Sequence, residues 1–219
     1  MNIKSKIQLL ITNPGKFFKL VFNVLKSRVL LLVNPDGNRF STDLEVATLR
    51  KYAKVSRFGI VEIGVLDGKT TKEMAQSAIV PIYGIDPIIP DSMNKRLIGH
   101  ETAIKRNLEF YKDFHFIKDF SYNVAPRWKE KFDFIFIDGD HAYEAVLKDF
   151  EDWFPLIEPN GIISFHDSAP VTSIPGAFAG WPGPTRLVAE LKNDPRVEFL
   201  ETQDSLSVFK KITNARIDK

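Results

Sequence analysis

The sequence predicts an α/β fold: a doubly wound, mostly parallel sheet with helices on both faces and an antiparallel strand at one edge. Short apolar runs alternate along the chain with segments of helical periodicity, an order typical of βαβ units. Acidic residues follow most of these runs. Only a short turn separates the last two runs, which indicates a hairpin rather than a parallel crossover.

Seven apolar runs are expected to form strands. In chain order they span residues 57–63, 82–85, 115–118, 134–137, 162–165, 197–200 and 205–210. The helices expected between them span residues 41–53, 69–77, 101–112 and 185–193, with a further helix after Asp140, which is expected to be its N-cap. The fold domain is therefore expected over residues 36–211, followed by a tail over 212–219.

Composition excludes several classes of protein. The 219 residues contain no cysteine, which excludes disulfides and thiol catalysis and fits a cytoplasmic protein. Residues 1–35 hold six lysines and arginines and no acid, which leaves 24 basic against 28 acidic residues in the remainder. A net negative domain without a basic face is not typical of a nucleic-acid binder.

Residues 1–35 form a separate, basic extension. From Pro14 onwards, lysines fall on one stripe at helical spacing and apolar side chains on the other, which predicts an amphipathic helix. Lys26 and Arg28 interrupt the apolar stretch, so it is too short to span a membrane. Two interpretations stay open: peripheral contact with an anionic membrane surface, or packing on the domain or on a second copy of the chain.

The loop after the first strand indicates a nucleotide-like ligand. Gly64 permits a tight turn and Gly68 a close helix start, while Asp86 ends the second strand, where an acid can bind a ribose diol. A dinucleotide site would need a glycine where Leu66 stands, and Asp67 places a negative charge where phosphates would lie. Both features oppose NAD but not a cationic, phosphate-free cofactor.

Four sequence motifs carry a family resemblance. They are E-I-G-x-x-x-G-x-T, I-D-P, F-I-D-G-D-H-x-Y and F-H-D. In this order they resemble Rossmann-like class I S-adenosylmethionine-dependent methyltransferases. The resemblance is strongest to metal-dependent O-methyltransferases of the catechol, macrolide-sugar and cephalosporin-pathway type, over roughly residues 41–211. It implies cofactor-binding roles for Glu62, Gly64, Gly68, Thr70, Asp86 and Ser121.

A second group of residues follows two neighbouring strands. Asp138 and Asp167 end adjacent parallel strands, so their carboxylates are expected to converge. Carboxylates favour Mg²⁺, and His166 would also admit Mn²⁺. The resemblance implies a metal site formed by Asp138, His166 and Asp167, although a carboxylate is more usual at position 166. His166 as a buried, satisfied histidine and a site without metal are the alternatives.

His141 is the candidate general base. It lies three residues after Asp138, the offset at which the resembled enzymes place a catalytic His or Lys, and its ordinary pKa of about 6.5 suits proton transfer near neutral pH. In the segment 168–184, Phe178 and Trp181 are expected either to wall an acceptor pocket or to anchor the loop to the core.

Together these observations predict methyl transfer from S-adenosylmethionine to a hydroxyl of a small molecule or sugar. Asp138 and His141 are the expected catalytic residues. Two other classes stay open: a non-catalytic cofactor-binding or scaffolding protein of the same fold, and a nucleotide-dependent oxidoreductase.

Overall fold

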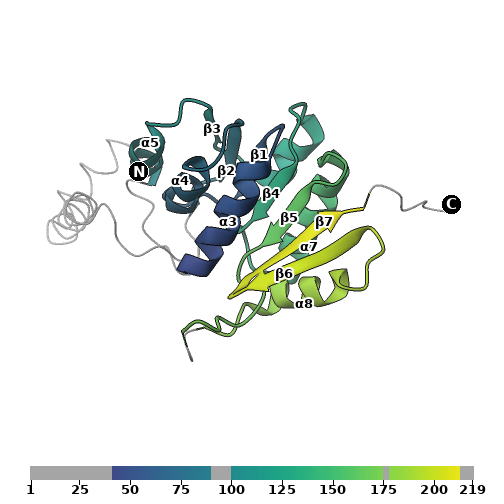
Figure 1. Cartoon of the computed structure of the whole chain (residues 1–219). Coiled ribbons are helices and arrows are strands. Elements are labelled where there is room, and N and C mark those ends of the chain that lie inside the picture. The colour runs from purple at the N-terminus through teal and green to yellow at the C-terminus, as the bar shows by residue number, and fades with distance from the viewer. Residues whose placement is uncertain (1–40, 90–99, 175–177, 213–219) are drawn as a thin grey trace, which may run out of the picture.

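The computed structural model describes residues 41–89, 100–174 and 178–212 (Figure 1). The amphipathic helix expected in residues 1–35 and nearly all of the expected tail lie outside the described residues. Among the residues that are described, no helix is long and apolar enough to cross a membrane.

A seven-stranded sheet organises the described part of the chain, in the order β3-β2-β1-β4-β5-β7-β6. The strands are β1 (Ile60–Ile63), β2 (Ile82–Ile85), β3 (Phe114–Ile117), β4 (Phe134–Ile137), β5 (Ile162–Phe165), β6 (Val197–Gln203) and β7 (Leu206–Lys211). The first five pair in parallel, and β7 pairs antiparallel with both β5 and β6. The predicted fold class is confirmed, with β7 one place in from the edge and β6 as the edge strand.

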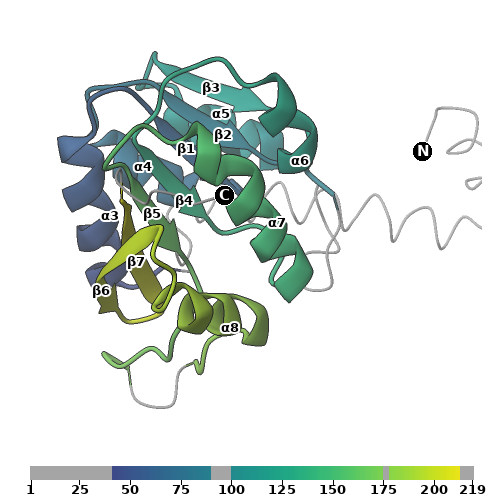
Figure 2. The same ribbon diagram turned by 90° about the vertical axis from the view of Figure 1, so that its right-hand side faces the viewer.

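Helices cover both faces of the sheet (Figures 1 and 2). On one face lie α3 (Asp43–Val55), α4 (Lys69–Ala75) and α5 (His100–Leu108). On the other lie α6 (Ser121–Val124), α7 (Tyr143–Trp153) and α8 (Pro182–Leu191). Two short 3-10 turns, η1 (Ala125–Arg127) and η2 (Phe154–Leu156), follow α6 and α7.

Each face of the sheet carries its own apolar core. The central strands are buried along their whole length, as in β1 and β4, which is why they are continuous apolar runs in the sequence. Trp153, Phe132 and Phe165 fill the core under α7 and α8, and Phe134 and Phe136 fill the core under α3 and α4. Large aromatic side chains therefore pack on both sides of the sheet.

Two helix starts differ from the prediction. The N-cap of α7 is Ala142, not Asp140; the Asp140 carboxylate instead accepts a hydrogen bond from the backbone N–H of Ala142 (2.9 Å). The helix expected from residue 185 begins at Pro182, because proline is favourable in the first helical turn, where no intrahelical donor is needed. The helix expected over residues 41–53 begins with a reciprocal capping box formed by Thr42 and Glu45.

Candidate active site

The register of the sheet brings the predicted reactive residues to one edge. Ile63, Ile137 and Phe165 are aligned across β1, β4 and β5. The residues that follow them are held by the same ladder: the N–H of Asp138 donates to Ile63 (2.8 Å), and that of His166 donates to Ile137 (3.1 Å). The predicted convergence at the carboxyl ends of β4 and β5 follows from this alignment.

Three side chains at this edge form a compact acidic group. His141 Nε2 lies 3.1 Å from Asp167 Oδ2 and 3.8 Å from Asp138 Oδ1. Within the described ranges, Asp138, His141 and Asp167 are the group whose ligand atoms all lie close enough to hold one metal ion, within 4.8 Å of one another. All three are partly exposed, so a ligand can reach them.

The backbone at Asp167 is strained. Its φ is 54°, a left-handed conformation that non-glycine residues rarely adopt and that aspartate tolerates better than most. Its carbonyl oxygen accepts from the N–H of Trp181 (2.8 Å), which ties the following loop to this position. Strain of this kind, about 1–3 kcal/mol, clusters at functional sites.

His166, the third expected metal ligand, is buried between both aspartates and Glu45. Its side chain is 3% exposed, and both ring nitrogens are engaged. Nδ1 lies 3.1 Å from Asp138 Oδ1 and 3.3 Å from Asp167 Oδ1, and Nε2 lies 3.4 Å from Glu45 Oε2. This geometry favours the alternative of a buried, satisfied histidine, and it is His141 that joins the two aspartates in the metal-competent group.

Electrostatics keep both histidines more basic than usual. Burial alone would lower the pKa of His141, but the close contact with Asp167 and the charges of Asp138 and Asp167 outweigh it and raise the pKa. Burial likewise opposes the charged form of His166, yet Asp138 and the contact with Glu45 raise its pKa well above the ordinary value. The buried Glu45 carboxyl has a lowered pKa in return, because its contacts with His166 and Ser205 outweigh burial.

The loop between β1 and α4 lies beside this group. Gly64 has a φ of 89°, and a Cβ there would lie 2.6 Å from the carbonyl carbon of Asp138. Only glycine therefore lets the loop approach β4 so closely. The predicted roles of Gly64 and Gly68 in a tight turn and a close helix start agree with this geometry, since Gly68 has a φ of 79° and begins α4 against α5.

Glu62 is a buried acid beneath this loop. Its Oε2 accepts a hydrogen bond from Thr71 Oγ1 (2.5 Å), and its Oε1 has no hydrogen-bond partner among the described residues. Burial, with the nearby charges of Asp138 and Asp86, raises the pKa of Glu62 well above its ordinary value despite the hydrogen bond from Thr71. An unpartnered buried carboxyl oxygen is costly and suits a donor or cation brought by a ligand.

Asp86 holds the loop between β1 and α4 in place. Its Oδ2 accepts from the backbone N–H groups of Val65 and Leu66, each at 2.9 Å, and its Oδ1 accepts from Ile88 (2.7 Å). The amides that would cradle a pyrophosphate in a dinucleotide site are therefore occupied by a carboxylate. This arrangement opposes phosphate binding in the same way as the predicted effect of Leu66 and Asp67.

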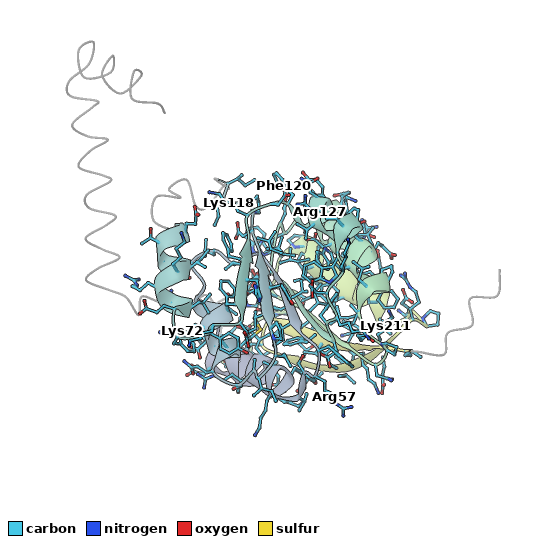
Figure 3. All side chains as sticks on the ribbon, turned by 90° about the horizontal axis from the view of Figure 1, so that it is seen from above. Arg57, Lys72, Lys118, Phe120, Arg127 and Lys211 are labelled. Atoms are coloured by element: carbon cyan, nitrogen blue, oxygen red, sulfur yellow. The ribbon has the colours of Figure 1, made fainter. Side chains whose placement is uncertain are left out.

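Two further predicted cofactor residues begin helices on opposite faces of the sheet. Thr70, in the first turn of α4, is half-buried, and its hydroxyl lies 3.5 Å from that of Ser41. Ser121 begins α6 and is buried; its hydroxyl donates to Asp149 of α7. Figure 3 shows Phe120, beside Ser121, at the same end of the molecule as Lys118 and Arg127.

The loop after β5 covers the reactive group. The rings of Trp181 and His141 lie 5.4 Å apart, and Phe178 contacts Trp181 edge-on at 6.2 Å. Gly183 packs directly on the backbone of His141 and Ala142, where a side chain would not fit. Of the two open interpretations of these aromatic residues, a wall beside the reactive group agrees with their position.

Three site residues escaped the sequence analysis: Glu45, Thr71 and Asp149. The capping-box motif signals Glu45 as a helix-start residue, and nothing in it indicates contact with His166. Thr71 lies next to the predicted Thr70, and only the helix phase decides which of the two faces Glu62. Asp149 appears as part of a charged helix face in the sequence, whereas it is buried against Ser121.

Comparisons with known proteins agree on the fold. Residues 61–168 match the family described as "Methyltransferase domain". An uncharacterized protein of Acanthamoeba polyphaga mimivirus is 31% identical over 117 residues, which cover 49% of this chain and 50% of that protein. The chain thus spans about half the length of this curated relative.

Solved structures extend the likeness beyond the family match. An O-methyltransferase from Bacillus cereus in complex with SAH (S-adenosylhomocysteine) superposes with a TM-score of 0.59 at 19% identity, covering 95% of this chain and 97% of that one. The N-methyltransferase NodS from Bradyrhizobium japonicum, also in complex with S-adenosylhomocysteine, gives a TM-score of 0.54 at 16% identity, covering 80% and 89%. Residues 61–168 therefore match a methyltransferase domain family, and the chain shares the fold of these solved methyltransferase structures.

Proposed function

We propose that this protein transfers a methyl group from S-adenosylmethionine to a hydroxyl group of a small molecule or sugar. The observation that carries the proposal is the convergence of Asp138, His141 and Asp167 at the sheet edge, directly against the glycine loop that approaches Asp138. A cofactor site and a proton acceptor thereby share one edge. Positioning and deprotonation then supply the rate, without a covalent intermediate.

The residues around the glycine loop fit a cationic cofactor without phosphate. The unpartnered Oε1 of Glu62 suits a positively charged or donor group, Gly64 and Gly68 give the close approach, and the first turn of α4, with Thr70, suits a carboxylate. Asp86 and Ser121 complete the expected set for the ribose and the adenine. The role of Asp86 in holding Val65 and Leu66 is compatible with this, because each carboxylate oxygen can accept more than one hydrogen bond.

His141 is the group that takes the proton of the acceptor hydroxyl. Asp167 lies against its Nε2, which keeps the ring oriented and stabilises its protonated form as an aspartate does for a catalytic histidine. The Trp181 ring, in the loop after β5, lies against the His141 ring. We expect Trp181 and Phe178 to contact an apolar portion of the acceptor.

Two carboxylates and an imidazole also fit a divalent ion such as Mg²⁺ or Mn²⁺. When bound, such an ion supplies Lewis acidity that lowers the pKa of an acceptor hydroxyl. Asp138 and Asp167 would hold it. His141 would either join them as a ligand or act as the base. These roles exclude each other, because a neutral imidazole has only one nitrogen lone pair free to bind a metal ion or a proton. We propose the role of base for His141, with Asp138 and Asp167 as the residues that would hold the ion.

The first test of the proposal is ligand binding. Calorimetry is expected to show binding of S-adenosylhomocysteine and none of NAD, since the loop amides are occupied by Asp86. Asp138→Asn is expected to abolish methyl transfer, whereas Asp140→Asn, the same change two residues away, retains it because Asp140 only accepts from Ala142. Tight NAD binding, or turnover that survives Asp138→Asn and His141→Gln, would contradict the proposal.

The second test separates the two roles of His141. Free Mn²⁺ can be titrated by its electron paramagnetic resonance signal into the wild type and His141→Gln. With His141 as base, the variant is expected to keep Mn²⁺ affinity within about threefold and to lose turnover by about 10²-fold or more. His115→Gln serves as control, because His115 is exposed and stacks on Tyr83. A loss of Mn²⁺ binding in His141→Gln would make His141 a ligand.

The remaining alternative is a non-catalytic protein of the same fold. It predicts S-adenosylhomocysteine binding without turnover on any hydroxyl acceptor. The N-methyltransferase NodS has this fold too, so the fold itself does not choose the acceptor atom. The hydroxyl assignment is favoured by the acidic group at the sheet edge, since a general base and a cation site suit an acceptor that must lose a proton.

A further inference from the structure

Glu45 extends the reactive edge to a helix that precedes the matched methyltransferase region. It lies in the first turn of α3, 16 residues before residue 61, where the family match begins. Only 1% of the residue is exposed. Its Oε1 accepts from the N–H (2.8 Å) and hydroxyl (2.6 Å) of Ser205, at the turn between β6 and β7. Its Oε2 accepts from the N–H of Thr42 (2.7 Å) and faces His166.

His166 connects this carboxylate to both aspartates of the site. One ring nitrogen faces Glu45 Oε2 at 3.4 Å, and the other faces Asp138 Oδ1 at 3.1 Å and Asp167 Oδ1 at 3.3 Å. The ring is held edge-on against Phe136, with centroids 5.9 Å apart. A continuous path of polar side chains thus runs from Glu45 of α3 through His166 to Asp138 and Asp167.

The physical role of this path follows from charge. Asp138 and Asp167 are two carboxylates close together, and like charges so close repel each other unless a donor lies between them. The Nδ1 of His166 lies between them, within hydrogen-bond distance of Asp138 Oδ1 and in ion-pair contact with Asp167 Oδ1. A buried imidazole between carboxylates needs a fixed orientation, and Glu45, anchored by Ser205 and Thr42, fixes the opposite end of the ring.

We propose that Glu45 is a positioning residue of the active site, which acts through His166 to hold Asp138 and Asp167 in the arrangement that binds a divalent ion. This inference rests on the metal role in the proposed function. Partners that orient metal ligands from behind typically change metal affinity 10- to 100-fold when they are altered. The α3 helix is accordingly part of the site and not only a cover on the sheet.

The decisive variant is Glu45→Gln. Glutamine is the other residue typical of the third position of a capping box, so the helix start is retained, but its amide oxygen can serve only one of the two sides that the carboxylate serves. The dissociation constant for Mn²⁺, measured by electron paramagnetic resonance, is expected to rise about tenfold or more. Affinity for S-adenosylhomocysteine is expected to stay within about twofold, because Glu45 makes no described contact with the glycine loop.

Thr42→Ala provides the matched structural control. Thr42 Oγ1 accepts from the N–H of Glu45 and donates to Asp204, so its removal weakens the same helix start without touching His166. The control is expected to lower the melting temperature and to leave Mn²⁺ affinity unchanged. If Thr42→Ala weakens Mn²⁺ binding as much as Glu45→Gln at an equal loss of stability, Glu45 is a structural brace and the inference fails.

A double-mutant cycle shows whether Glu45 acts through His166. In a His166→Asn background, Glu45→Gln is expected to cause no further loss of Mn²⁺ affinity, since coupled residues are non-additive. Additive losses would overturn the inference, as would wild-type affinity in Glu45→Gln. If His166→Asn does not fold, the comparison of Glu45→Gln with Thr42→Ala still decides. A wild type that binds S-adenosylhomocysteine but no Mn²⁺ removes the metal role, and with it this inference, while leaving methyl transfer open.

Discussion

Gly64→Ala is expected to damage both the fold and the reactive edge, and Gly68→Ala to damage the fold less. Both glycines have a left-handed φ, 89° and 79°, so either alanine costs about 1–2 kcal/mol in backbone strain. They differ in what the new Cβ meets. At Gly64 it lies 2.6 Å from the carbonyl carbon of Asp138, whereas at Gly68 the nearest atom is the flexible end of Leu108, at 3.2 Å.

The difference between the two variants can be estimated from these contacts. A collision with backbone cannot be relieved by turning a side chain, and overpacking of this kind adds about 1–3 kcal/mol. Gly64→Ala is therefore expected to destabilise by about 2–5 kcal/mol and Gly68→Ala by about 1–2 kcal/mol. For a chain of this size, each kcal/mol lowers the melting temperature by about 2–4 °C.

Thermal unfolding and Mn²⁺ titration of the two variants provide the assay. Because the Gly64→Ala collision pushes on the backbone of Asp138, we expect that variant also to weaken Mn²⁺ binding, and Gly68→Ala to leave it near the wild-type value. Equal stability losses in the two variants, or undiminished Mn²⁺ binding in Gly64→Ala, would refute the argument that Gly64 is required by its approach to β4.

Three further predictions concern other parts of the domain. Burial, opposed by the hydrogen bond from Ser121, raises the pKa of Asp149 to about 6; the folded state then binds more protons than the unfolded state between about pH 4 and 6, so stability falls as pH rises through that range. Asp149→Asn, which can still accept from Ser121, is therefore expected to be more stable than the wild type at pH 8 by up to about 3 kcal/mol, and urea unfolding that shows the same stability difference at pH 5 and pH 8 would contradict this. Asp204 accepts hydrogen bonds from backbone and hydroxyl groups of the loop after β5, so Asp204→Ala is expected to cost about 2–3 kcal/mol and to speed proteolysis in that loop; unchanged cleavage would show that the loop is held elsewhere. Trp181→Ala is expected to leave S-adenosylhomocysteine affinity unchanged and to raise the KM of a hydroxyl acceptor at least fivefold, because the Trp181 ring lies against the proposed base His141; an equal effect on the cofactor would argue against its role as an acceptor wall.

The sequence by itself determined the fold class and the place of the reactive edge. Apolar runs of four to seven residues separated by helical segments allow few arrangements other than a parallel, doubly wound sheet. In such a sheet the carboxyl ends of the strands meet at one edge, so Asp138 and Asp167 had to lie near each other wherever the helices packed. The glycines of the first loop were equally readable, because their backbone requirements are local.

Only the tertiary structure decided which side chains meet at that edge. His141 and His166 both lie close to an aspartate in sequence, and the sequence contains no signal for the direction of either ring. The orientation of the His166 ring is set by its contact with Glu45, 121 residues away. The sequence around Glu45 indicates only a helix cap. The same holds for Asp149, whose burial depends on the packing of α7 against Ser121. Long-range contacts of single polar side chains follow from packing between elements, and no local pattern encodes them.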